Sequence, residues 1–440
     1  MRFILALILT IASIEASAFA AVSGVQFAPD GNKQSSPDMN KDVTTLKSLV
    51  EEARKNNPEI KAARAKWEAS TKRPTQESTL PNPEIGVSYK NVSFDKLTLG
   101  DDDFTELGVY ASQEFPFPGK LDLKGKIAKE EAEAEGELVE AAVRRVTADL
   151  KESYYNWYLA NKSIEITSKN KELLERITKS AETKYEVGKG GQQDVIRAQL
   201  EVSGFIERLE LLKQQKEIVE AKIRSILNSP HDSPLGKPEE IKKSGFALTS
   251  DELYKLIESD SPILKTKKNL IEKSDQVLNL AKRQYFPDFV LELGWFNRGE
   301  FTNDGPFADE WMARVGFIVP LYFWKKEKFG VEEAMSQLQE MKEEYNSTNQ
   351  NLRFAVKEKY ITAKTSEKLL DLYSEGIIPQ SSLSLESAIS GYQVGDVDFL
   401  TLIDSSVALF NFELEYNKHL IEYQKALARL EEVTGVELTK

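Results

Sequence analysis

The longest regular pattern in the chain is that of an amphipathic helix, predicted over residues 120–187. Apolar side chains recur three or four positions apart along it: Leu138, Ala142, Val146, Leu150, Tyr154, Trp157 and Tyr158. This spacing places them on one face of a helix, and no proline interrupts the range. A helix of about 65 residues is about 100 Å long. Since a domain of this size has no interior of that length, the pattern predicts an extended helical bundle or tube.

Before the helix, two segments alternate between apolar and polar residues, which is typical of β-strands with two different faces. The apolar positions are Ile85, Val87, Tyr89, Leu107, Val109 and Ala111. A polar loop containing residues 101–103 separates the two segments. The pattern therefore predicts a β-hairpin over 84–115.

The second half of the chain repeats the first. Three pairs of prolines each lie 204 positions apart: Pro58 and Pro262, Pro83 and Pro287, Pro116 and Pro320. The motif Y-x-V-G occurs at 185–188 and again at 392–395. A shared register over this length indicates a tandem duplication in which each copy is one structural unit.

Each repeat is predicted as helix, hairpin, long helix and helix. The first repeat, 45–228, contains a helix over 42–72, the hairpin 84–115, the long helix 120–187 and a helix over 192–228. The second repeat, 250–434, contains a helix over 250–283, the hairpin 288–319, a long helix over 325–393 and a helix over 399–433. We expect a kink in the second long helix at Gly376 and Pro379. Residues 229–249 form a linker and 435–440 a C-terminal tail.

The first 20 residues read as a secretory signal peptide. Arg2 precedes an apolar run, and small residues up to Ala20 fit a cleavage site. Residues 21–44 are rich in Ser, Asn, Asp and Gly, so we expect a flexible leader. The chain has no cysteine, which excludes disulfides and thiolate metal sites. Its net charge of −13 argues against a nucleic acid partner.

The hairpins allow two interpretations. A half-buried sheet on a soluble core has one apolar and one polar face. A lipid-facing barrel wall has the same alternation and strands of about 10 residues. Export favours the barrel wall. Four strands cannot close a barrel, and an open edge within a bilayer is very costly. The membrane interpretation therefore requires several chains to share one barrel, and the pattern does not fix their number.

The order of elements, the motif E-F-P-F-P-G-K-L at 114–121 and the two Y-x-V-G motifs resemble the TolC-like outer-membrane efflux channels. The proline-rich motif is similar to the branch that serves heavy-metal and cation efflux. The resemblance implies a mainly α fold with a small membrane β part. It implies a homotrimer with a twelve-stranded β-barrel in the outer membrane and a helical α-barrel in the periplasm. The implied partners are outer membrane lipid, a periplasmic adaptor and an inner-membrane pump.

The candidate site lies at the two helical turns that carry the Y-x-V-G motifs. Its residues are Gly188, Gly395, Tyr185, Tyr392, Asp194 and Asp404. The glycines suit a left-handed turn after a long helix. The resemblance implies that Tyr392 bonds across to Asp194 to hold the tip closed, and that Asp404 lines the narrowest ring. Alternatively, both aspartates are acids favoured near helix N-termini.

The sequence departs from the family pattern at the second turn. Val397 stands where some members have a latching arginine, and Thr401 where they have a second aspartate ring. We therefore expect a less charged gate.

The resemblance implies a passive exit duct of a tripartite efflux pump or type I secretion system, passing cations, drugs or other solutes. The alternative is a soluble periplasmic coiled-coil scaffold. We expect no enzyme activity, cofactor or metal site, because no catalytic motif appears and the two histidines, His231 and His419, lie far apart. The expected location is the outer membrane, extending into the periplasm.

Overall fold

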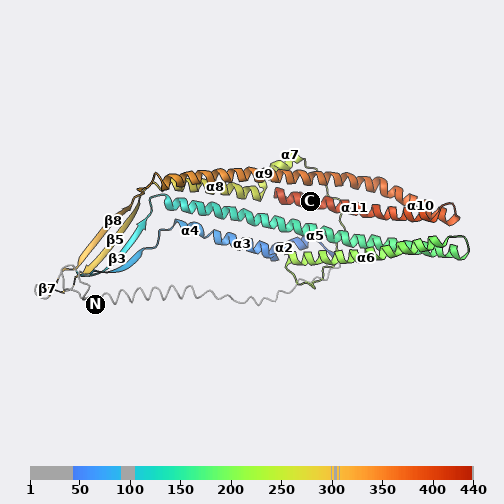
Figure 1. Cartoon of the computed structure of the whole chain (residues 1–440), viewed down its shortest axis with the longest axis horizontal. Coiled ribbons are helices and arrows are strands. Elements are labelled where there is room, and N and C mark those ends of the chain that lie inside the picture. The colour runs from blue at the N-terminus through green and yellow to red at the C-terminus, as the bar shows by residue number, and fades with distance from the viewer. Residues whose placement is uncertain (1–42, 91–104, 299, 302–304, 307, 439–440) are drawn as a thin grey trace. The chain divides into compact units, whose positions relative to one another are not determined.

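The computed structural model describes residues 43–90, 105–298, 300–301, 305–306 and 308–438 (Figure 1). The signal peptide predicted over 1–20 and most of the leader predicted over 21–44 lie outside this range. The leader's last two residues form strand β1 (Val43–Thr44), which pairs in parallel with β4 (Lys237–Pro238). The prediction of an unstructured leader is wrong at these two residues. The hydroxyl of Tyr154 donates to the Thr44 carbonyl at 3.0 Å and so anchors the strand.

The first repeat is dominated by α5 (Lys120–Glu186), a helix of 67 residues, followed by α6 (Gln192–Leu227). The single helix predicted over 42–72 is wrong, because the chain forms α2 (Leu46–Asn56), α3 (Pro58–Ser70) and α4 (Arg73–Ser78). Asn57 has ψ of 127°, as expected before a proline. Its side chain accepts from the Glu59 amide at 2.9 Å and donates to the Ile226 carbonyl at 2.8 Å.

The second repeat has the same break in its first helix. Ser261 separates α7 (Ser250–Asp260) from α8 (Pro262–Arg283), so the single helix predicted over 250–283 is also wrong. The second long helix consists of α9 (Lys326–Leu372) and α10 (Ile378–Val394), joined by the π-helical turn η1 (Tyr373–Ile377). This turn lies where the sequence predicts a kink, and Pro379 occupies the first turn of α10. The repeat ends with α11 (Phe399–Thr434).

Four antiparallel strands form one sheet in the order β2-β3-β5-β8. They are β2 (Glu84–Lys90), β3 (Glu106–Phe115), β5 (Asp288–Asn297) and β8 (Glu310–Ile318). A small pair, β6 (Glu300–Phe301) and β7 (Gly305–Pro306), lies between β5 and β8 in the chain. The predicted loop at 101–103 lies outside the described residues. The sheet is at the end of the helices where α5 and α9 begin, and the two helical turns are at the opposite end (Figure 1).

The two faces of the sheet differ in an unusual way, because the apolar face is the exposed one. Ile85 and Val87 are 68% and 70% exposed, and Trp311 is 82% exposed. On the other face Phe296 is buried over Gly108 and Gly294, where a Cβ would collide with its ring. A sheet packed on a soluble core would bury the apolar side chains, so the arrangement fits a lipid-facing wall.

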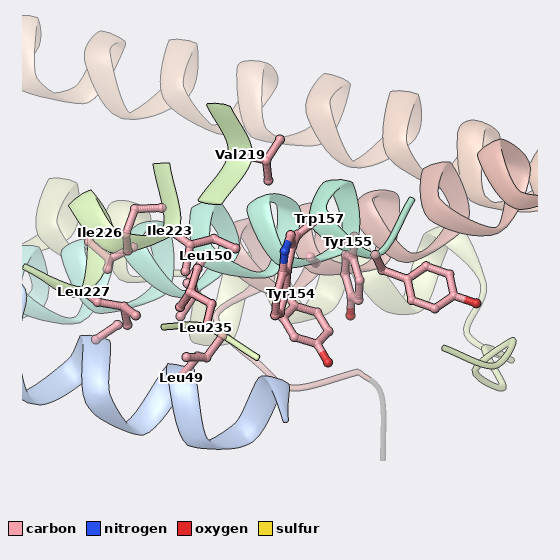
Figure 2. Packing of buried hydrophobic residues seen from close by; sticks show 14 of the residues in the cluster. Leu49, Leu150, Tyr154, Tyr155, Trp157, Val219, Ile223, Ile226, Leu227 and Leu235 are labelled. Atoms are coloured by element: carbon pink, nitrogen blue, oxygen red, sulfur yellow. The ribbon is translucent and has the colours of Figure 1, made fainter. Parts of the chain in front are cut away.

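The helices pack around three clusters of buried apolar side chains. One lies at the middle of α5, where α2, α6 and the linker meet it (Figure 2). The side chains predicted there as a seam are buried from Ala142 to Tyr158, whereas Leu138 is 39% exposed. The indole of Trp157 donates to Glu220 Oε1 at 3.0 Å. Burial raises the pKa of Tyr154 to about 12.

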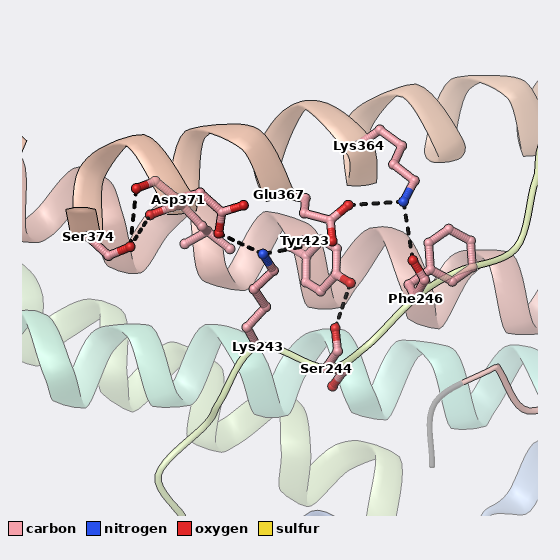
Figure 3. Close-up of polar contacts among 9 residues, drawn as sticks. Lys243, Ser244, Phe246, Lys364, Glu367, Asp371, Ser374 and Tyr423 are labelled. Atoms are coloured by element: carbon pink, nitrogen blue, oxygen red, sulfur yellow. Dashed lines mark hydrogen bonds and ion pairs between the residues drawn. The ribbon is translucent and has the colours of Figure 1, made fainter. Parts of the chain in front are cut away.

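The linker between the repeats packs across α9 and α11 (Figure 3). Tyr423 of α11 donates to the Ser244 carbonyl at 2.7 Å. Lys243 pairs with Asp371 of α9 at 2.7 Å, and Lys364 donates to the Phe246 carbonyl at 3.2 Å. The linker is therefore a strap that holds two helices of the second repeat.

No helix in the part of the chain that the structure describes is both long and apolar enough to cross a membrane.

Candidate functional site

The first turn reverses the chain between α5 and α6. Gly188 adopts a φ of +71°, in the left-handed region that favours glycine. Its amide donates to the Tyr185 carbonyl at 3.0 Å, and the Lys189 amide donates to the Lys184 carbonyl at 2.8 Å. These bonds satisfy carbonyls that the helix leaves free at its end. Gly188 thus has the predicted turn conformation, whereas Tyr185 is 47% exposed.

The second turn has the same conformation but a different cap. Gly395 has a φ of +91°, and its amide donates to the Gly391 carbonyl at 3.0 Å. The residue before the next helix is Asp398, whose carboxylate accepts from the Thr401 amide at 2.7 Å. This backbone hydrogen bond lowers the pKa of Asp398. The second turn is therefore closed by an aspartate at the helix N-cap.

Tyr392 is the most enclosed residue of the predicted site. It is 7% exposed and its ring meets Phe399 edge-on at a centroid distance of 5.6 Å. The Lys184 ammonium of the first turn lies 3.8 Å from the ring centroid and donates to the Tyr392 carbonyl. Burial, and then the negative charge of Asp194, raise the pKa of Tyr392. Tyr392 therefore joins the two turns within one chain.

Asp194 lies at the third position of α6. Its carboxylate accepts from the Gly191 amide at 3.4 Å, so that it caps its own helix. Among the described contacts no hydrogen bond joins Asp194 to Tyr392 in the same chain. The structure thus brings the two residues within electrostatic reach but leaves Asp194 as an N-terminal acid.

Asp404 projects from the exposed side of α11. Its neighbours Leu402 and Ile403 are only 2% and 1% exposed and face the core, whereas Asp404 is exposed. No ion pair involving Asp404 is found within the described part of the chain. Nor do those residues contain a group of three or more histidine and acidic side chains placed to hold a metal ion.

The two turns rest on a shared apolar core. It includes side chains of α5, α6, α10 and α11, among them Leu174, Ala198, Leu385, Tyr392 and Phe410. Phe205 of α6 and Phe410 of α11 meet at 4.8 Å, with the Arg208 guanidinium 4.9 Å from the Phe410 ring. A displacement of one turn would therefore disturb the packing of the side chains that support the other turn.

Two residues of this site were not predicted. Asp398 could have been found, because an aspartate followed by an apolar run after a glycine turn is a helix N-terminus signal. Lys184 carries only the weak signal of a basic residue in the last turn of a helix. Its contact with Tyr392 joins residues 208 positions apart, which no local pattern shows.

The sequence and the fold of this chain were both compared with those of known proteins. The sequence model of a family described as "Outer membrane efflux protein" matches residues 49–229 and 253–436. The cobalt-zinc-cadmium resistance protein CzcC of Cupriavidus metallidurans is 19% identical over 402 residues, which cover 89% of this chain and 90% of that protein.

Solved structures resemble the whole described fold. CusC has a TM-score of 0.76 at 16% identity, covering 89% of this chain and 92% of that chain. VceC of Vibrio cholerae has a TM-score of 0.74 at 16% identity, covering 89% and 96%. The match of the family to both repeats agrees with the duplication seen in the sequence.

Proposed function

Because this chain belongs to the outer membrane efflux protein family, we propose that three copies close into one channel whose periplasmic tip is gated at the two helical turns. The protein is an outer membrane efflux channel that extends into the periplasm and acts as a passive exit duct. The alternative interpretation as a soluble periplasmic scaffold is wrong, because the family match covers both repeats.

The free edges of the chain support closure by several copies. The sheet ends in β2 on one side and β8 on the other, and neither edge is paired among the described strands. Unpaired backbone groups in a bilayer cost several kcal/mol each, and the smallest common barrels need about eight strands. Three copies supply twelve strands, the number that the family resemblance implies.

The layer of helices, like the sheet, ends in two elements that have a neighbour on one side only. Within the chain α6 packs on α5, and α9 and α10 pack on α11, so α6 and α9–α10 are outermost. Both edges carry exposed apolar side chains at helical spacing: Ile196, Leu200, Leu211 and Ile218 on α6, and Phe354, Ile361, Leu372 and Leu383 on α9 and α10. Such stripes are typical of surfaces that another copy covers.

The gate consists of Tyr392, Asp194 and Asp404, positioned by the turns at Gly188 and Gly395. In this proposal the Tyr392 and Asp194 side chains, which lie within electrostatic reach of each other in one chain, hold the tip closed, and the Tyr185 side chain is exposed there. Three Asp404 carboxylates around one axis repel each other and favour cations. What supports this is the exposure of Asp404 on the side of α11 that faces away from the core.

Transport energy and selectivity come from partners in this proposal. A periplasmic adaptor docks at the tip and an inner-membrane pump delivers the substrate. Divalent metal cations are the substrate class we favour, because the relative CzcC is named for cobalt, zinc and cadmium resistance. A ring of carboxylates is compatible with such a substrate.

Single-channel recording tests the gate. Asp404→Ala should raise the conductance in a planar bilayer and weaken block by a trivalent cation, because it removes three charges from the narrowest ring. Asp251→Ala, an exposed aspartate of α7, makes the same charge change away from the tip and should leave both properties unaltered. If Asp404→Ala conducts and is blocked as the wild type is, the constriction lies elsewhere.

A further inference from the structure

An aromatic pocket follows the last strand of the sheet. The turn after β8 carries Leu321, Tyr322, Phe323 and Trp324, each at least half exposed. With Tyr285 and its neighbours this turn lines a cavity of about 590 Å³. So large a group of exposed aromatic side chains marks a contact surface.

The equivalent place in the first repeat is covered. The offset of 204 places Phe117 at the position of Leu321, and Lys120 at that of Trp324. Phe117 stacks on Phe286 with ring centroids 4.6 Å apart. The Lys120 ammonium, 3% exposed as a residue, donates to the Phe286 carbonyl at 3.0 Å and pairs with Asp288 at 2.8 Å. The segment 283–288 leads from α8 into β5 and therefore covers residues 117–120, where sheet and helix meet in the first repeat (the first junction). The second junction is the equivalent place at residues 321–324.

The same offset identifies the segment that would cover the second junction. Residues 79–84 correspond to 283–288 and lead into β2. All six are exposed, including Leu80, Pro81 and Pro83. In the sheet order β2-β3-β5-β8, each hairpin has its second strand beside the first strand of the next hairpin, so β3 lies beside β5. In a closed ring, the strand next to β8 is the β2 of another copy.

We propose that the aromatic pocket of one copy binds residues 79–84 of the next copy. This inference rests on the ring of copies proposed above and assigns its contact at the junction of sheet and helices. The partner subunit's Asn82 takes the place of Phe286 and lies against Leu321. Trp324 replaces the lysine that would otherwise meet the partner subunit's Glu84. The contact between copies thus joins aromatic side chains to a proline-rich segment, whereas the corresponding contact within a chain combines an aromatic stack with an ion pair.

Cysteine cross-linking tests the contact cleanly, because the chain has no cysteine of its own. Leu321→Cys combined with Asn82→Cys should give covalent dimers and trimers on oxidation of the outer membrane protein. Phe117→Cys combined with Phe286→Cys is the matched pair within a chain and should give an oxidised monomer only. Each single variant should give no ladder.

A third pair separates this inference from the ring itself. Gln113 pairs with Leu291 in the sheet, so the offset places Phe317 opposite the partner subunit's Val87. If Phe317→Cys with Val87→Cys forms the ladder and the junction pair does not, the ring stands and the pocket contact is overturned. If neither forms it, both proposals fail.

Lipid is the other occupant that the test must detect. Trp311 on the exposed apolar face should be quenched by brominated phospholipid, and its share of the quenching is measured with Trp311→Phe. Trp324, covered by the partner, should contribute little, so that Trp324→Phe loses less than half as much quenched emission. Equal losses would mean that lipid fills the pocket and would overturn the proposal.

Discussion

The two repeats have the same order of elements but are held differently at both ends. At the sheet end, the first repeat is closed by the ion pair between the buried Lys120 and the half-buried Asp288, whereas the second presents Trp324 to the outside. At the turn end the first repeat exposes Tyr185, and the second buries the equivalent Tyr392. Each repeat therefore buries its distinctive side chain at one end and exposes the equivalent one at the other end. The first repeat buries Lys120 and exposes Tyr185, whereas the second exposes Trp324 and buries Tyr392.

The turns show how few residues make this difference. The N-cap of the helix after the first turn is Gly191 and its third residue is Asp194. After the second turn the N-cap is Asp398, with Thr401 at the third position. The aspartate carboxylate therefore lies at the third helical residue after the first turn and at the N-cap after the second turn. Duplication preserves the backbone, while single side chains decide which surface stays within the chain.

Removing Lys120 should have the largest effect. Lys120→Met leaves the half-buried Asp288 without its ammonium partner, which we expect to cost about 3 kcal/mol of unfolding free energy. Lys325→Met, an exposed lysine of the second junction, should have no measurable effect. The measurement is the thermal unfolding midpoint in detergent. Equal midpoints for the two variants would show that the junctions are not held differently.

The turn glycines should come next, and they should behave alike. Gly188→Ala and Gly395→Ala each force a side chain into the left-handed region, at about 1–2 kcal/mol. Among the described atoms none lies within 4 Å of the added Cβ, so strain is the whole cost. Gly204→Ala inside α6 also meets open space and should instead stabilise by about 0.5–1 kcal/mol.

Limited proteolysis at the turns measures this locally. Both turn variants should be cleaved faster than the wild type, and Gly204→Ala should not. A much larger effect at Gly395 than at Gly188 would mean that the buried Tyr392 depends on the turn in a way that backbone strain does not explain.

Much of the fold could be predicted because it depends on local periodicity. The 67-residue helix and the alternating strands follow from side chains whose spacing fixes which face is apolar. The left-handed turns at Gly188 and Gly395 are also local, since only glycine adopts them without strain. The breaks at Asn57 and Ser261 do not follow from the periodic pattern. They follow from Pro58 and Pro262, because a proline disfavours the helical conformation of the residue before it.

The contacts that distinguish the repeats could not be predicted. Lys120 and Asp288 lie 168 positions apart, and Lys184 and Tyr392 lie 208 apart. Such pairs depend on how helices and strands pack, which composition and spacing do not encode. Likewise, the sequence identifies Asp194 and Asp404 as candidates, but only the structure shows that one caps its own helix and the other is exposed.

The smallest effect concerns the charge between the two turns. Burial and the charge of Asp194 raise the pKa of Tyr392 above the ordinary value near 10, so the folded state holds the phenolic proton more tightly than the unfolded chain. The free energy of unfolding should therefore fall as the pH rises above about 10.

Asp194→Asn should lower the pKa of Tyr392 without removing the effect of burial, which is the larger cause. Ultraviolet absorbance titration measures it as the difference between each protein and its Tyr392→Phe counterpart, which isolates one of 15 tyrosines. Glu186→Gln, a charge change at the exposed end of α5, serves as the control and should not shift the titration. If Asp194→Asn also leaves it unshifted, the carboxylate is too far or too solvated to act on Tyr392. The two turns would then be joined within a chain through Lys184 and the apolar core alone.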